Sequence, residues 1–233
     1  MEDVILACTE PSARSRSAID WAAREARLHG LPLRVVLGPP KEPGQAKMIV
    51  CGVSREAAVT DCPSGPLRPE TVDPSGGRPV VLVPDGSTSA DHSGRVVVGV
   101  DARDPSDGVI AFAFGCARAR GAGLHAVHAW SLPSRAAAWP FGVPEKERAT
   151  WEDHEVQLLA DALRPWREKH PDIPVWEDVL LFPPAQALLH HSGSTALVVV
   201  GHRSCTEWGA VVQTLLREAA CPVAVVPTGA APR

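Results

Sequence analysis

A histidine and a cysteine lie three residues apart near the end of the chain, at His202 and Cys205. Both side chains are zinc ligands, and a histidine can also act as the base that activates a thiol. The sequence shows no second ligand pair at a zinc-site spacing, and His202 is the only base close in sequence to Cys205. We therefore expect no metal site and no catalytic residues here, and a thiol-dependent activity at Cys205 is the least supported alternative.

The other histidines predict no metal site either. His125 and His128 lie three residues apart in an apolar run that is typical of a strand, where they face opposite sides of the sheet. His190 and His191 end a short predicted helix, where we expect solvated side chains favoured by the negative partial charge of the helix C-terminus.

The composition is that of a globular chain. Of its 233 residues, 45% are hydrophobic, and the formal net charge is −4 with scattered Lys and Arg, so we expect no nucleic-acid partner. No apolar run approaches the ~20 residues of a membrane span. The six cysteines show no CxxC spacing and most lie in apolar runs, which favours reduced thiols in the cytoplasm. We expect Cys205 and Cys62 to react first. Nothing in the sequence identifies a protein partner.

An internal repeat organises the elements that would position a site. The segment RPVVLVPDG at residues 78–86 returns as CPVAVVPTG at residues 221–229, and MIVCG at residues 48–52 resembles LVVVG at residues 197–201. Each copy also contains an earlier matching segment, and the distance from that segment to the ones above is much shorter in the first copy. The first copy has therefore lost a block of residues after its second strand. We expect a truncated repeat, a linker, a complete repeat and a tail, at residues 1–86, 87–94, 95–228 and 229–233.

In the complete repeat, buried apolar runs alternate with stretches of helical periodicity, which is typical of an α/β fold with a parallel sheet. Its five strands are expected at residues 96–100, 124–129, 175–181, 196–200 and 223–226. Its four helices are expected at residues 107–120, 151–170, 183–191 and 211–220. The helix at residues 151–170 carries Val156 and Leu159 among its predicted core positions.

The truncated repeat keeps four strands, expected at residues 4–8, 33–37, 48–53 and 80–83, and one helix at residues 18–29. Residues 38–47 are too few for a crossover helix, which with its connections needs at least ~10–12 residues, so the edge strand and its helices are missing. Residues 54–77 show no phosphate-loop pattern, and we expect no nucleotide in this half.

Four motifs in order resemble the universal stress protein family: VGVD, LHAVHAW, LVVVG and CPVAVV, at residues 98–101, 124–130, 197–201 and 221–226. The segment WREKHPDIPV at residues 166–175 is similar too. The resemblance implies two Rossmann-like repeats of the adenine-nucleotide-alpha-hydrolase type, with strand order 3-2-1-4-5 in the second. It also implies that the fifth strands pair as an intramolecular pseudo-dimer. The missing third strand of the first repeat leaves residues 33–37 as an exposed edge, which we expect any further homo-oligomer to use.

In that strand order the winding reverses between strands one and four, so a crevice opens at their carboxyl ends. By resemblance, Asp101 and Ala129 would hold ATP or another adenine nucleotide through its adenine and ribose. The tentative nucleotide-binding residues that join them in the crevice and its phosphate loop are Gly99, Gly201, Arg203, Ser204, Gly209 and Ala210.

The phosphate loop departs from the family pattern Gly-x2-Gly-x9-Gly-Ser/Thr. Ser204 replaces the second glycine, and Ala210 falls at the hydroxyl position if the loop is shortened. Glu207 adds negative charge where a triphosphate would lie, which Arg203 could offset. Asp101 could instead cap the next turn, and Gly201 could serve a tight turn.

We therefore expect a non-catalytic binding or regulatory module of the stress response with a degenerate nucleotide site. One alternative is a functional ATP or AMP binder that uses Asp101 and the Gly201 loop. A second is a weak nucleotide hydrolase or a thiol-dependent enzyme. Trp130 and Trp139 lie in a Pro-rich loop at residues 130–144, which we expect to form a lid packed on the domain.

Overall fold

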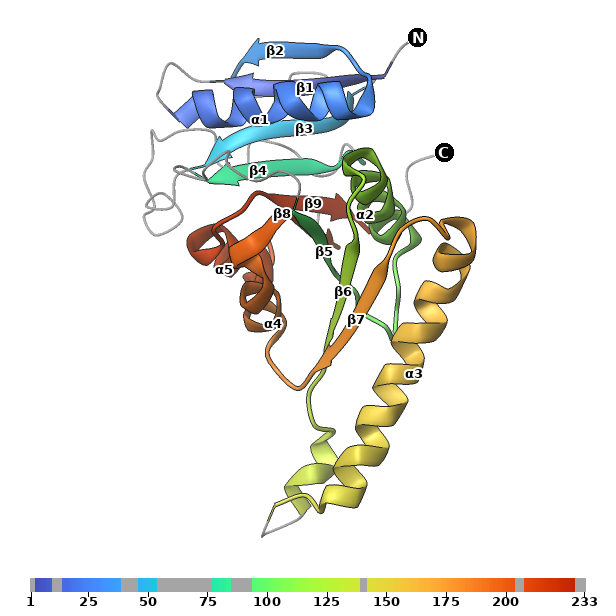
Figure 1. The fold of residues 1–233 in the computed structure, drawn as a ribbon. Coiled ribbons are helices and arrows are strands. Elements are labelled where there is room, and N and C mark those ends of the chain that lie inside the picture. The colour runs from blue at the N-terminus through green and yellow to red at the C-terminus, as the bar shows by residue number, and fades with distance from the viewer. Residues whose placement is uncertain are drawn as a thin grey trace.

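The computed structural model describes residues 3–9, 14–38, 46–53, 77–84, 94–138, 142–203 and 208–228. Within these ranges, nine strands form one sheet in the order β2-β1-β3-β4-β9-β8-β5-β6-β7. The strands turn progressively from β2 at one edge to β7 at the other, so the sheet is strongly twisted (Figure 1). The described sheet is therefore a mostly parallel α/β sheet of the Rossmann-like type, as predicted.

The C-terminal half, residues 94–228, contains five strands: β5 (Arg95–Gly99), β6 (Leu124–Ala129), β7 (Val175–Leu180), β8 (Thr195–His202) and β9 (Val223–Pro227). Its α-helices are α2 (Asp107–Arg120), α3 (Glu145–Lys169), α4 (Pro184–His191) and α5 (Ala210–Glu218), and two short 3-10 turns are η3 (Ser134–Ala138) and η4 (Ser192–Ser194). The strand order β7-β6-β5-β8-β9 is 3-2-1-4-5 in chain order, as expected.

The N-terminal half, residues 3–84, contains β1 (Val4–Thr9), α1 (Arg14–His29), β2 (Leu33–Leu37), β3 (Ala46–Val53) and β4 (Val80–Pro84). β1 pairs in parallel with both β2 and β3, and β3 pairs in parallel with β4. β2 is the edge strand, where Val35 and Leu37 are 49% and 77% exposed. The expected tail, and the expected linker except Gly94, lie outside the described residues.

The two halves meet where β4 runs antiparallel to β9, with Val80, Val81 and Leu82 opposite Val225, Ala224 and Val223. Prolines border this ladder, and because proline cannot donate a ladder hydrogen bond they keep it short. The pairing expected between the two Pro-flanked segments is therefore present within one chain.

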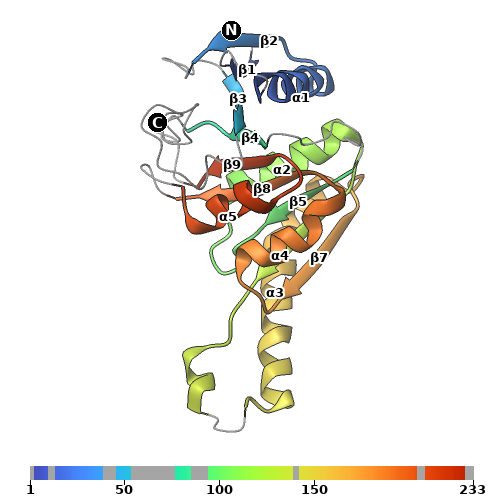
Figure 2. The same cartoon turned by 90° about the vertical axis from the view of Figure 1, so that its left-hand side faces the viewer.

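Helices cover both faces of the sheet (Figures 1 and 2). α1, α2 and α3 pack on one face around a core that contains Trp21, Phe114 and Leu159. α4 and α5 pack on the other face, where Leu188 and Leu215 are buried. Each face has a core that extends across the β4–β9 junction, so both halves share their hydrophobic interior.

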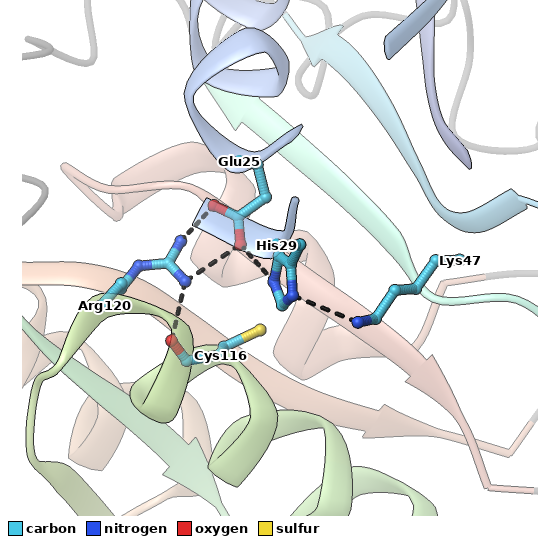
Figure 3. Close-up of polar contacts among 5 residues, drawn as sticks. All are labelled: Glu25, His29, Lys47, Cys116 and Arg120. Carbon is cyan, nitrogen blue, oxygen red and sulfur yellow. Dashed lines mark hydrogen bonds and ion pairs between the residues drawn. The ribbon is translucent and has the colours of Figure 1, made fainter. Parts of the chain in front are cut away.

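A buried ion pair joins α1 to α2 across the junction (Figure 3). Arg120 donates to both carboxylate oxygens of Glu25, at 2.6 and 3.0 Å, and each side chain is 1% exposed. His29 Nε2 lies 3.1 Å from Glu25, and Lys47 Nζ donates to His29 Nδ1 at 3.2 Å. Burial alone would raise the pKa of Glu25, but the hydrogen bond to His29 and the charge of Arg120 hold it below its usual value.

The structure corrects three expectations about the segment before β7. α3 begins at Glu145 rather than residue 151, and its buried face contains Glu155, whereas Val156 is 47% exposed. The loop expected to pack on the domain as a lid does so only in part. Residues 130–133 line the cavity described below, whereas η3 packs on α3, with the Arg135 guanidinium 5.1 Å from the centre of the Trp151 ring, and projects with it from the sheet (Figures 1 and 2). Trp139 lies outside the described residues.

Candidate functional site

A cavity of about 1050 Å³ opens at the carboxyl ends of β5, β6 and β8. This is the point where the winding of the sheet reverses, because β5 lies between β6 and β8. The described lining residues all belong to the C-terminal half. The volume of the cavity is sufficient for a ligand of nucleoside or nucleotide size.

Most of the predicted site residues gather at this cavity. Its lining includes Gly99, Asp101, Ala129, Gly201 and Arg203. Gly209 and Ala210 begin α5 and are not among the lining residues, although Val211 is. Ser204 lies outside the described residues, as do Cys205 and Glu207.

Gly201 is needed for close packing and not for a tight turn. It lies inside β8, which continues to His202, and its φ is not positive. A Cβ atom at this position would lie 2.7 Å from Thr228 Cγ2 and 3.2 Å from Val109 Cγ2. The missing side chain therefore lets α2 and the end of β9 approach β8 at the wall of the cavity.

Apolar side chains form much of the cavity wall. Val127, Trp130 and Leu188 are buried in the lining, whereas Leu132 and Phe182 are 39% and 55% exposed where they line it. Exposed apolar side chains grouped around a cavity are typical of a ligand site. The wall can therefore enclose a flat, largely apolar ligand.

The charged side chains of the lining are already engaged in ion pairs. Arg203 donates to Asp104 at 2.7 Å and lies 3.5 Å from Asp101. Asp101 also accepts a hydrogen bond from the backbone N–H of Arg103 at 3.2 Å, so it caps the turn after β5 as well as lining the cavity. The structure thus shows the turn-capping role of Asp101, whereas its contact with a ligand stays a prediction.

A buried polar network supports the loop after β5, and the sequence did not indicate it. His128 Nδ1 lies 3.0 Å from the carbonyl oxygen of Val100 and 3.3 Å from the N–H of Ala102. Its Nε2 lies 3.0 Å from Glu155, which also accepts a hydrogen bond from Arg103. The sequence indicated only that His128 and His125 face opposite sides of the sheet, and it did not indicate the partners of His128.

The remaining candidates give no catalytic arrangement within the described residues. His202 is 7% exposed, with its ring 5.2 Å from that of Trp208. Cys8, Cys51, Cys116 and Cys221 are buried and form no disulfide. None of the described helices combines the length and apolar character that crossing a membrane requires.

The comparisons with known proteins agree with this architecture. The sequence profile of the universal stress protein family matches residues 92–227. A universal stress protein of Mycolicibacterium smegmatis is 29% identical over 294 residues, which cover 95% of this chain and 96% of that protein. A universal stress protein of Mycobacterium tuberculosis is 32% identical over 158 residues, which cover 67% of this chain and 52% of that protein. Against this and other mycobacterial relatives the match thus spans about half of their length.

Solved structures resemble the whole described architecture. A universal stress protein from Archaeoglobus fulgidus has a TM-score of 0.58 and 16% identity, and the match covers 98% of this chain and 88% of that one. At this identity the likeness shows the fold alone. The family profile, in contrast, covers more than half of the chain and includes every strand around the cavity. The chain therefore belongs to the universal stress protein family.

Proposed function

We propose that this chain is a non-catalytic binding module whose cavity takes an adenine nucleoside or mononucleotide in preference to a nucleoside triphosphate. The observation that carries the proposal is the pairing of Arg203 with Asp104 and Asp101 in the cavity lining. The proposal keeps the adenine ligand implied by the family resemblance and limits its phosphate content.

The apolar part of the ligand has a suitable wall. Trp130, Val127 and Leu188 offer contact to a flat base, and the exposed Phe182 can cover it from the mouth. The Asp101 carboxylate lies beside them at the end of β5 and can accept hydrogen bonds from ribose hydroxyls. These groups together suit a nucleoside.

The charge balance disfavours a polyphosphate. Four charged side chains occur in the described lining: Asp101, Arg103, Asp104 and Arg203. Arg103 is engaged by Glu155, and Arg203 is engaged by two carboxylates. A phosphate group would have to displace a carboxylate from Arg203, and further phosphates would meet Asp101 and Asp104 without a described cation to neutralise them. One phosphate is therefore the most that this lining accommodates well.

The non-catalytic assignment rests on the contacts that His128 makes in the cavity lining. His128 is the one imidazole in the described lining, and both of its ring nitrogens are engaged, one by the backbone near Val100 and one by Glu155. A bound ligand would have to displace one of these contacts before it could hydrogen-bond to a ring nitrogen of His128. The regulatory role in stress, the cytoplasmic location and the division of the chain into two repeats stay part of this proposal.

Titration calorimetry with adenosine, AMP and Mg·ATP tests the preference. We expect adenosine and AMP to bind at least ~10-fold more tightly than Mg·ATP, a difference of ~1.4 kcal/mol. Asp101→Ala should weaken adenosine binding, because it removes the ribose acceptor. Mass spectrometry of the native protein should detect a nucleoside or mononucleotide if any ligand co-purifies.

The variant Asp104→Asn sharpens the test, because it removes a carboxylate from Arg203 and frees positive charge for phosphate. We expect it to strengthen AMP and ATP binding relative to adenosine. Asp153→Asn, an exposed position on α3, is the matched control for the change in net charge and should alter nothing. Tighter binding of Mg·ATP than of adenosine by the unmodified chain, or no binding of any of the three ligands, contradicts the proposal.

A further inference from the structure

Two histidines and an aspartate converge at the other end of the sheet from the cavity. His125 comes from the start of β6, Asp178 from β7, and His191 from the last residue of α4. His125 Nε2 lies 2.8 Å from Asp178 Oδ2, and His191 Nε2 lies 3.2 Å from the same oxygen. The three ligand atoms all lie within 4.8 Å of one another.

The fold explains this convergence. His125 pairs with Trp176 in the register of β6 and β7, so Asp178, two residues further along β7, projects from the same face of the sheet. α4 packs on that face and ends at His191. The sequence placed His191 in solvent, but its side chain is only 17% exposed, whereas His190 is exposed as expected.

The geometry of the three atoms suits a tetrahedral metal ion. Zinc binds histidine nitrogen and carboxylate oxygen at ~2.0 Å, so two ligands of a tetrahedral ion lie ~3.3 Å apart. The separations of 2.8 and 3.2 Å need only a small expansion to reach that value. His191 Nε2 is buried and makes no hydrogen bond of good geometry, so a lone pair on this atom is available to a metal.

The electrostatics also favour a cation. The C-terminus of α4 adds negative partial charge. Asp178 is 39% exposed, which gives an ion a path of entry and leaves room for water as a fourth ligand.

A second group of potential ligands, Glu25, His29 and Cys116, is less suitable (Figure 3). Arg120 occupies both oxygens of Glu25, and Lys47 occupies His29 Nδ1. An ion there would meet two cations in a buried region. Within the described part of the chain, no hydrogen bond or ion pair joins a Lys or Arg side chain to the cluster at His125.

We propose that His125, Asp178 and His191 form a binding site for a divalent transition-metal ion of the zinc type, with water as the fourth ligand. The bound ion joins the end of α4 to β6 and β7. Because α4 begins at Pro184 in the cavity wall, the ion also holds that wall in place from its far end.

Calorimetric titration of the tag-free, chelator-treated chain with ZnCl₂ tests the site. We expect one ion per chain, a higher melting temperature with zinc, and with Co²⁺ the visible absorption of tetrahedral coordination. His125→Gln, His191→Gln and Asp178→Asn should each weaken zinc binding by at least ~100-fold, the upper end of what the loss of a merely orienting neighbour causes.

Three variants serve as controls. His190→Gln removes an adjacent exposed histidine, and His29→Gln and Cys116→Ser remove ligands of the rival group; all three should bind zinc like the unmodified chain. The absence of one-to-one binding, binding that survives His191→Gln, or binding lost in His29→Gln overturns the proposal. Melting curves without metal check folding, and the Co²⁺ spectrum of the unmodified chain decides the coordination if a ligand variant does not fold.

Discussion

The N-terminal and C-terminal halves begin with the same strand–helix–strand unit and end on matching strands, β4 and β9, yet the described lining of the cavity belongs entirely to the C-terminal half. The cavity walls come from segments that follow β6 and β7, such as Trp130 and Phe182. Among the described residues of the N-terminal half, β2 is an edge strand and no equivalent of β7 pairs with it. Strand order alone thus creates the position of a site, and the connections at the strand ends create the site itself.

The halves also differ in how their charges are used. In the C-terminal half, Arg203 and its carboxylates lie exposed at the cavity, where a ligand can exchange with them. Glu25 of the N-terminal half instead forms a buried ion pair with Arg120 of the C-terminal half. The N-terminal half therefore acts as a support that completes the sheet and anchors α2, the helix that begins at the cavity wall.

The largest effect is expected from breaking that anchor. Arg120→Ala leaves the carboxylate of Glu25 buried without its partner, which should lower the free energy of unfolding by ~3–5 kcal/mol. Denaturant melts should still show one cooperative transition, because both halves share their core. The double variant Glu25→Leu/Arg120→Met should recover most of the loss. Two separate transitions in the unmodified chain would show that the halves are independent units.

A smaller effect is expected from filling the close approach at the end of β8. Gly201→Ala places a Cβ 2.7 Å from Thr228, so we expect a loss of ~1–3 kcal/mol in unfolding free energy and weaker adenosine binding. Gly115→Ala is the matched control, because its Cβ would meet nothing within 4 Å and it lies in α2, where alanine should stabilise by up to ~1 kcal/mol. Equal behaviour of the two variants would contradict the packing role of Gly201.

Acid should loosen the joint between the halves. The pKa of Glu25 is held below its usual value by His29 and Arg120 against the effect of burial. Its contribution is therefore complete above the unfolded-state pKa, ~4.3, and is lost as the pH falls through the lower folded-state value. Unfolding free energies from pH 7 to pH 3 should fall less steeply for Glu25→Gln than for the unmodified chain. Parallel curves would show that this carboxyl does not titrate with folding.

The smallest response is expected from the buried thiols. Burial raises the pKa of Cys116 to about 12 and that of Cys221 to about 11, so almost no thiolate exists at pH 8. Mass mapping after alkylation of the folded chain should find both unmodified, with labelling only as fast as unfolding. Rapid labelling of Cys116 in the folded chain would show that the joint between α1 and α2 opens readily.

Local patterns were sufficient for most of the elements, and the family resemblance supplied the strand order that places the cavity. The apolar runs at β2 and β6 and the capped, periodic segment at α2 were predicted with the bounds that the structure has. The repeated Pro-flanked segments, together with the pairing of fifth strands that the family resemblance implies, predicted the contact of β4 with β9, because an unpaired apolar edge favours pairing. The strand order that the resemblance implies brings the carboxyl ends of β5 and β8 together, and the structure has Asp101 and Gly201 in the cavity lining there.

The polar partnerships were decided only by tertiary structure. Glu25 and Arg120 are 95 positions apart in sequence, and His125 and Asp178 are 53 apart. Apolar periodicity reports which face of an element is buried, but not which charged side chain on that face meets a partner. This is why Val156 was misplaced and Glu155 was missed. Those contacts depend on how elements that are distant in sequence pack together: α1 with α2, α3 with β6, and α4 with β6 and β7. A charge is stable in the interior only where another element brings its partner, and sequence periodicity does not show which element that is.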